Sequence, residues 1–111
     1  MGLTRSELFT AEQNQLAELA KVLGHPARIA ILQHLLQAEQ CINGELVTEL
    51  GLAQATISQH LKELKRVGLI QGTISGKAVC YCIDPVRWRE ARQQLLGLFN
   101  ELPQAKNQDC C

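Results

Sequence analysis

The 111-residue sequence lacks an apolar run long enough to cross a bilayer, and residues 1–13 contain no hydrophobic signal segment. Aromatic residues make up only 4% of the chain, so a core must be aliphatic, which favours helices packed on helices. Net charge is absent too, because eleven basic residues balance eleven acidic ones. We therefore expect one cytoplasmic domain with no membrane partner, and total charge gives no hint of nucleic-acid binding.

The chain also lacks an even number of cysteines. It has five, which do not suit a complete intramolecular disulfide framework. Thiols stay reduced in the cytoplasm. We expect the cysteines to be ligands, sensors or small core residues rather than disulfide partners.

What is present is a polar-faced segment between Gly51 and Gly68. Ile57, Leu61 and Leu64 have the spacing of one helical face. The opposite face carries hydrogen-bonding side chains with hardly any acid among them: Gln54, Thr56, Ser58, Gln59 and Lys62. Such side chains read base edges and hold phosphates, so the segment is interpreted as a DNA-reading helix.

Basic charge gathers around this helix although the whole chain is neutral. Residues 52–77 hold a single acid, Glu63, against four basic residues: Lys62, Lys65, Arg66 and Lys77. A local basic patch is a modest electrostatic signal for nucleic acid.

The hydrophobic periods predict a mainly α fold with a small β-hairpin, a winged helix-turn-helix. The expected elements, in chain order, are helices over 6–23, 26–39, 44–50 and 54–67, strands over 69–74 and 79–83, and a helix over 85–102. Lys77 lies at the tip of the hairpin, where it suits a phosphate contact. The domain is expected to cover 1–102, followed by a cysteine-bearing tail over 103–111.

The last helix carries a wider apolar stripe than so small a core needs. Its members recur at helical spacing: Val86, Trp88, Ala91, Leu95, Leu98, Phe99 and Leu102. We expect this stripe, together with the first helix, to form a homodimer surface.

Three segments together resemble the ArsR/SmtB family of winged-helix repressors: KVLGHPARIAILQHLL from Lys21, CINGELVTELGLAQATISQHLKELKRVGLI from Cys41, and SGKAVCYCI from Ser75. The resemblance implies a symmetric dimer that binds an imperfect inverted repeat in double-stranded operator DNA. Many such proteins release DNA when a metal or metalloid binds to ligand residues of the repressor, or when an oxidant reacts with them.

The resemblance places the polar side chains of residues 54–62, with Lys77 on the wing, on the DNA-reading positions. Ala53 departs from the family, which usually has a helix-capping serine there. His60 is assigned to the DNA-binding set, although it neighbours Leu61 and the edge of the core is an equal alternative for it.

The family's effector sites are matched only in part. One subgroup uses a Cys-x-Cys pair at the third helix, where this chain has Cys41 alone. Another binds zinc through histidines of the last helix, but residues 84–102 contain none. A third has vicinal cysteines near the C-terminus, as Cys110 and Cys111 are here.

Trivalent arsenic or antimony suits a three-thiolate site built on that C-terminal pair. Cys80, Cys82 or Cys41 is expected to supply the third sulfur, and Cys80 and Cys82 share one face of a strand. No resident cofactor is expected. The alternatives are a repressor that responds to thiol oxidation or persulfides, and one with no effector.

Two other function classes remain open at this stage. A thiol-dependent enzyme is disfavoured, because the cysteines lie on a strand or a tail without a helix N-terminus or a basic partner to lower their pKa. A protein-interaction module built on the same fold is harder to exclude. We expect a DNA-binding protein that is not an enzyme.

Overall fold

The computed structural model describes residues 6–38, 50–73 and 80–103. Four sequence expectations fall outside these residues: the helix over 44–50 apart from Leu50, the hairpin tip with Lys77, the site of Cys41, and the tail with Cys110 and Cys111.

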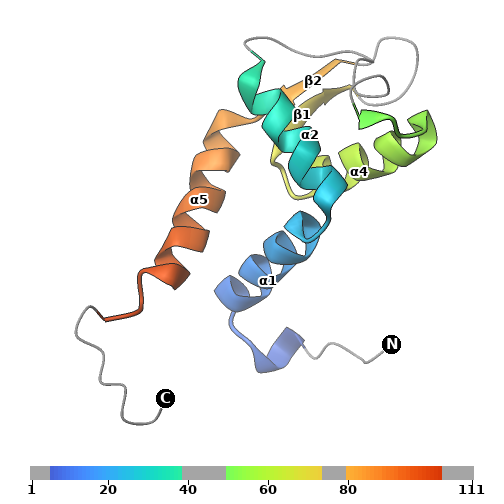
Figure 1. The fold of residues 1–111 in the computed structure, drawn as a ribbon. Helices are drawn as coiled ribbons and strands as arrows, with labels where there is room; N and C mark the ends of the chain where they lie inside the picture. Colours follow the sequence, from blue (N-terminus) through green and yellow to red (C-terminus); the bar gives the residue numbers. More distant parts are fainter. Residues whose placement is uncertain (1–5, 39–49, 74–79, 104–111) are drawn as a thin grey trace.

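The described chain is mainly helical with a small antiparallel hairpin, which confirms the predicted winged-helix fold (Figure 1). The elements follow in order: the 3-10 turn η1 (Ser6–Leu8), α1 (Ala11–Leu23), α2 (Pro26–Gln37), α4 (Gln54–Arg66), β1 (Ile70–Thr73), β2 (Cys80–Ile83) and α5 (Pro85–Phe99).

The helix ends follow local capping chemistry. The expected start of the first helix at Ser6 is wrong, because Thr10 and Gln13 form a capping box that begins α1 at Ala11. The last helix, α5, begins at Pro85 as predicted, because the Asp84 carboxylate caps it by accepting the N–H groups of Val86 and Arg87 at 3.1 and 3.2 Å. That helix ends at Phe99, short of the predicted 102.

The core lies where α1, α2, α4 and the hairpin meet. From α4 it takes Ile57, Leu61 and Leu64, each at most 1% exposed. The other helices and the hairpin contribute mostly aliphatic residues: Leu19, Val22, Ile31, Leu32, Leu35, Leu69, Ile70, Tyr81 and Ala91. Figure 1 shows α1 and α5 extending away from this core on the same side. Within the described ranges, no helix has the length and apolar character needed to cross a membrane.

The hairpin follows α4 after one tight turn. Gly68 adopts a φ of +86°, the left-handed conformation that commonly ends a helix. In the antiparallel register, Ile70 faces Ile83 and Gly72 faces Tyr81, whereas Gln71 faces Cys82. Tyr81 is buried, so the Ile70–Ile83 and Gly72–Tyr81 pairs lie on the core side of the hairpin. The pair of Gln71 and Cys82 lies on its outer side.

Candidate nucleic-acid interface

The helix α4 directs its polar face to solvent. Four of the predicted contact residues are exposed and Ser58 is half-buried; the exposed ones are Gln54, Thr56, Gln59 and Lys62. Near the start of the helix the Gln54 amide donates a hydrogen bond to Ser58 Oγ at 3.2 Å. Ala53 provides no side-chain cap, as the departure from serine predicts.

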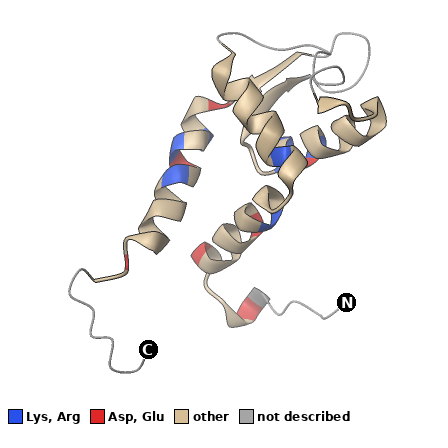
Figure 2. Cartoon of the chain, viewed as in Figure 1, with Lys and Arg blue, Asp and Glu red and all other residues tan. Residues whose placement is uncertain are grey.

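The basic residues of α4 differ in what they contact. All charged residues of this helix lie in its C-terminal half (Figure 2). Lys65 Nζ donates to the carbonyl oxygen of Gly72 at 2.6 Å, which ties the helix to β1. Arg66 forms ion pairs with Glu63 and with Glu18 of α1. Within the described residues, Lys62 is the remaining α4 cation and has no such partner, so the free positive charge is smaller than the sequence count suggests.

Arg66 and Glu63 stabilise each other's charged forms. The hydrogen bond from Arg66 lowers the pKa of the Glu63 carboxyl. In turn, the hydrogen bonds to Glu63 and Glu18 raise the pKa of Arg66. Both groups are exposed, so water screens the attraction and the contribution to stability is small.

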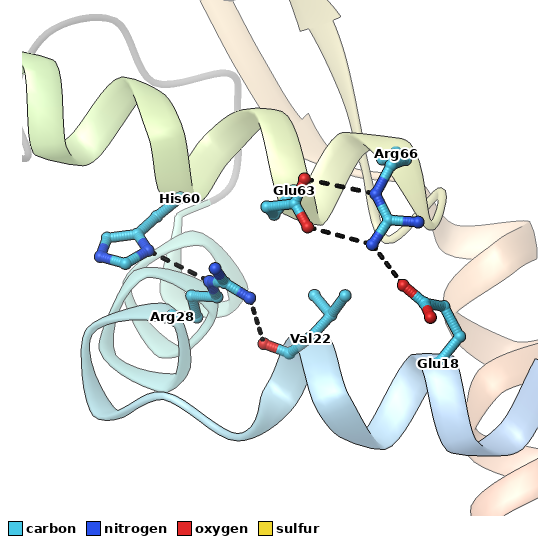
Figure 3. Close-up of polar contacts among 6 residues, drawn as sticks. All are labelled: Glu18, Val22, Arg28, His60, Glu63 and Arg66. Carbon is cyan, nitrogen blue, oxygen red and sulfur yellow. Dashed lines mark hydrogen bonds and ion pairs between the residues drawn. The ribbon is translucent and has the colours of Figure 1, made fainter. Parts of the chain in front are cut away.

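His60 does not belong to the exposed face, which corrects its assignment to the DNA-binding set. It is only 8% exposed, and its Nδ1 accepts a hydrogen bond from Arg28 Nε of α2 at 3.1 Å (Figure 3). Arg28 also donates through Nη1 to the carbonyl oxygen of Val22 at 3.1 Å. Through Arg28, His60 therefore joins the buried side of α4 to α2 and to the C-terminal end of α1.

The surroundings of His60 favour its neutral form. Burial lowers its pKa most, and the nearby His25 and Arg28 lower it further. The His25 ring lies 4.4 Å from the His60 ring, centroid to centroid, with a tilt of 57°. A proton on Nδ1 would also remove the acceptor that Arg28 uses.

A second set of polar contacts reaches α4 from α5. Arg87 Nε donates to the carbonyl oxygen of Val67, just past the end of α4, at 3.1 Å. Its Nη1 donates to Gln94 at 3.2 Å, and the Gln94 amide donates to Gln15 of α1 at 3.4 Å. A Cβ at Gly68 would lie 2.9 Å from Arg87 Cγ, so the close approach of the Arg87 side chain to this turn depends on the glycine.

The hairpin cysteines lie on the outer side of β2, as the strand period predicts. Cys80 is exposed and Cys82 is half-buried, and neither forms a disulfide within the described residues. Among residues 6–38, 50–73 and 80–103, no group of three or more histidine, cysteine or acidic side chains is placed to hold a metal. The predicted site on Cys110 and Cys111 lies outside these ranges, so it stays a prediction.

The described elements form a winged-helix fold in which α4 exposes a polar face. The bacterial regulatory protein family arsR matches residues 25–71. In solved structures, the crystal structure of Rv0081 from Mycobacterium tuberculosis superposes with a TM-score of 0.59 at 32% identity, covering 84% of this chain and 97% of that one. The chain belongs to the ArsR family.

Two curated relatives refine this placement. The HTH-type transcriptional repressor SmtB of M. tuberculosis is 44% identical over 64 residues, which are 58% of this chain and 47% of SmtB. The regulator CmtR of Mycobacterium bovis is 37% identical over 78 residues, 68% of this chain and 65% of CmtR. The chain thus spans about half the length of SmtB.

The sequence did not predict the side-chain contacts that join α4 to α1 and α2. Arg28 stands inside the quoted His-Pro-x-Arg motif, but nothing local shows that it pairs with His60 thirty-two positions away. The contact between Arg66 and Glu18 spans forty-eight positions and had no signal in the sequence beyond opposite charge.

Acidification is expected to destabilise the fold through His60. The unfolded state takes up a proton near the ordinary value of 6.5, while the folded state resists it because the His60 pKa is lowered. Stability contributed by neutral His60 is therefore present above about pH 6.5 and is lost as pH falls through the folded-state pKa. Denaturant unfolding of the wild type at pH 7 and pH 5 should show this loss, which is at most about 1.4 kcal/mol per unit of pKa difference.

His60→Gln keeps an acceptor for Arg28 but does not titrate, so its stability should fall less between the two pH values. His34→Gln, a histidine change outside the cluster, is the matched control and should keep the wild-type loss. Equal pH dependence of His60→Gln and the wild type would contradict this role for His60.

Proposed function

We propose that this chain is a DNA-binding transcriptional repressor that acts as a homodimer on operator DNA, with α4 as its reading helix. The exposed face of α4 is the observation that supports this most strongly. It offers amides, hydroxyls and a lysine that has no ion-pair partner among the described residues, with no acid in the first turn. Relatives named as repressors or regulators support the same function, and that function is not enzymatic.

Each group on this face has a role that its chemistry fits. Gln54 and Gln59 present side-chain amides, which bind adenine edges in the major groove with two hydrogen bonds. Lys62 provides a charge for a backbone phosphate. Without a side-chain cap at Ala53, the first N–H groups of α4 are available to a phosphate at the positive end of the helix dipole.

Exposed apolar side chains on the N-terminal segment and α5 support the homodimer. Leu8 and Phe9 precede α1, and α5 together with the turn after it exposes Val86, Leu96, Leu98, Phe99 and Leu102. Exposed apolar clusters of this kind mark protein interfaces. To contact successive major grooves, the two α4 helices of such a dimer would have to lie about 34 Å apart.

Coupling from the proposed dimer helix to the reading helix has a direct route. Arg87 of α5 holds the carbonyl at the end of α4, and Gln94 joins the same side chain to α1. A shift of α5 therefore changes the position of the C-terminal end of α4. An effector that moves α5 alters the fit of the dimer to DNA.

The proposed effector is a thiol-directed species, with trivalent arsenic or antimony first and an oxidant or persulfide as the alternative. Cys110 and Cys111 would provide two thiolates. The accessible side of β2 offers Cys80 and Cys82 as a third ligand. Soft thiolates favour such ions over hard ones.

DNA binding is expected to be salt dependent and to involve Lys62. Fluorescence anisotropy against a random duplex at two salt concentrations should give a clear fall in affinity as salt rises. Lys62→Gln should lower the magnitude of the logarithmic salt slope by about one, as the loss of one phosphate contact predicts. Lys21→Gln, which removes the same charge from an exposed position on α1, is the control and should leave the slope unchanged.

Two results would count against the DNA-binding proposal. Affinity without salt dependence indicates a protein-interaction module instead. An equal effect of Lys21→Gln and Lys62→Gln shows that charge in general, rather than the α4 face, determines binding.

Arsenite is expected to weaken binding to a duplex that the reduced protein has selected from a random pool. The usual coupling between two sites predicts a loss of about 5- to 150-fold. The double variant Cys110→Ser with Cys111→Ser should bind the duplex normally and no longer respond. A normal arsenite response in that variant would show that the site does not include the C-terminal pair.

A further inference from the structure

Two glutamines on the exposed face of α4 differ in how firmly their side chains are held. Gln54 begins the helix, and its Nε2 donates a hydrogen bond to Ser58 Oγ, one turn further along, at 3.2 Å. Gln59 is exposed as well, but within the described part of the chain its amide has no hydrogen-bond partner. The same functional group is therefore anchored at one position of this face and free to rotate at the other.

The sequence around each glutamine explains the difference. On a helix surface, a side chain lies beside the one four residues further along. Gln54 has Ser58 at that spacing, and a hydroxyl can accept a hydrogen bond from an amide. Gln59 has Glu63 there, whose two carboxylate oxygens already accept hydrogen bonds from Arg66 at 3.0 and 3.3 Å.

Ser58 is a well-fixed anchor for the Gln54 amide. It is half-buried, and it stands between Ile57 and Leu61, which are each 1% exposed in the core. Core packing therefore sets the position of its Cβ, and a hydrogen bond to it restricts the rotamers of Gln54. A long polar side chain that is restricted before binding loses less conformational freedom when it binds.

The anchor also decides which polar atoms of Gln54 are left for a ligand. A primary amide has two N–H donors and one carbonyl oxygen. Because one N–H is given to Ser58, one N–H and Oε1 remain side by side. In the major groove adenine presents the N7 acceptor beside the N6 donor, which matches this pair, whereas guanine presents two acceptors and would set its O6 against Oε1.

We propose that Ser58 is a positioning residue that holds the Gln54 amide in the orientation that reads adenine. Gln54 then sets the sequence preference of α4, and Gln59 makes an adaptable contact. This inference rests on the proposed DNA-binding function. A bidentate contact to the correct base discriminates against a wrong one by about 5- to 150-fold, and loss of one neutral hydrogen bond that orients it lowers the ratio by about 2- to 10-fold.

The test uses the full-length reduced protein and a duplex that it has selected from a random pool. Each base pair is replaced in turn and binding is measured by anisotropy, while Gln54→Ala and Gln59→Ala identify the position that each glutamine reads. We expect adenine at the Gln54 position. Replacement of that base by 7-deazaadenine, which lacks the N7 acceptor, should weaken wild-type binding about as much as a wrong base does.

The Ser58 variants separate positioning from a general effect on binding. Ser58→Ala should lower the preference for adenine about 2- to 10-fold at the Gln54 position and leave the Gln59 position unchanged. Alanine is the better helix former, so helix loss does not explain that result. Ser58→Thr keeps the hydroxyl and should restore the preference. In the free protein, NMR relaxation should show a more rigid side-chain amide for Gln54 than for Gln59, and Ser58→Ala should remove the difference.

Three outcomes overturn the inference. Guanine preferred at the Gln54 position means that the amide is held the other way round. An unchanged preference in Ser58→Ala means that the hydroxyl does not position Gln54, and an equal loss at both positions means that Ser58 acts on DNA binding in general. Absence of salt-dependent DNA binding, with the rigid Gln54 amide still observed in the free protein, would instead refute the proposed function and leave the contact between Gln54 and Ser58 standing.

Discussion

The position of α4 depends first on the burial of Ile57, Leu61 and Leu64, each at most 1% exposed. Full burial of such side chains contributes about 1.5–3 kcal/mol each. Rotation of the helix about its axis would bring them into water, so the outward direction of Gln54, Gln59 and Lys62 follows from this packing. The polar face of α4 needs no contact of its own to stay exposed. It is exposed because burial of the aliphatic face turns the opposite face of the helix toward solvent.

Polar contacts add precision that burial alone does not give. Arg28 holds His60 in the middle of α4, Glu18 meets Arg66 near its end, and Arg87 binds the carbonyl of Val67 just beyond it. These partners come from α2, α1 and α5 respectively. Aliphatic packing tolerates small sliding, whereas a directed hydrogen bond has a narrow geometry. The same contacts connect α4 to the elements proposed for dimerisation, and the proposed coupling between dimer and DNA would use them.

Local chemistry made much of the fold predictable from sequence. Gly68, Asp84 and the aliphatic spacing of α4 each act within a few residues, and the structure confirms all three. The start of the first helix was misplaced because its period continues before Thr10, while the capping box sets the boundary. His60 and Arg66 needed tertiary information: a partner thirty-two or forty-eight positions away decides whether a polar side chain is free. The DNA contacts and the cysteine site on the tail stay predictions, since both depend on molecules or residues outside the described chain.

The proposed function requires that DNA bind the polar face of α4. Backbone amide NMR spectra of the labelled protein, recorded during titration with the selected duplex, test it most directly. If DNA binds this face, the largest chemical-shift changes should fall between Gln54 and Lys62, with smaller changes on the hairpin strands. Changes concentrated on α1 and α5, with α4 unaffected, would contradict it.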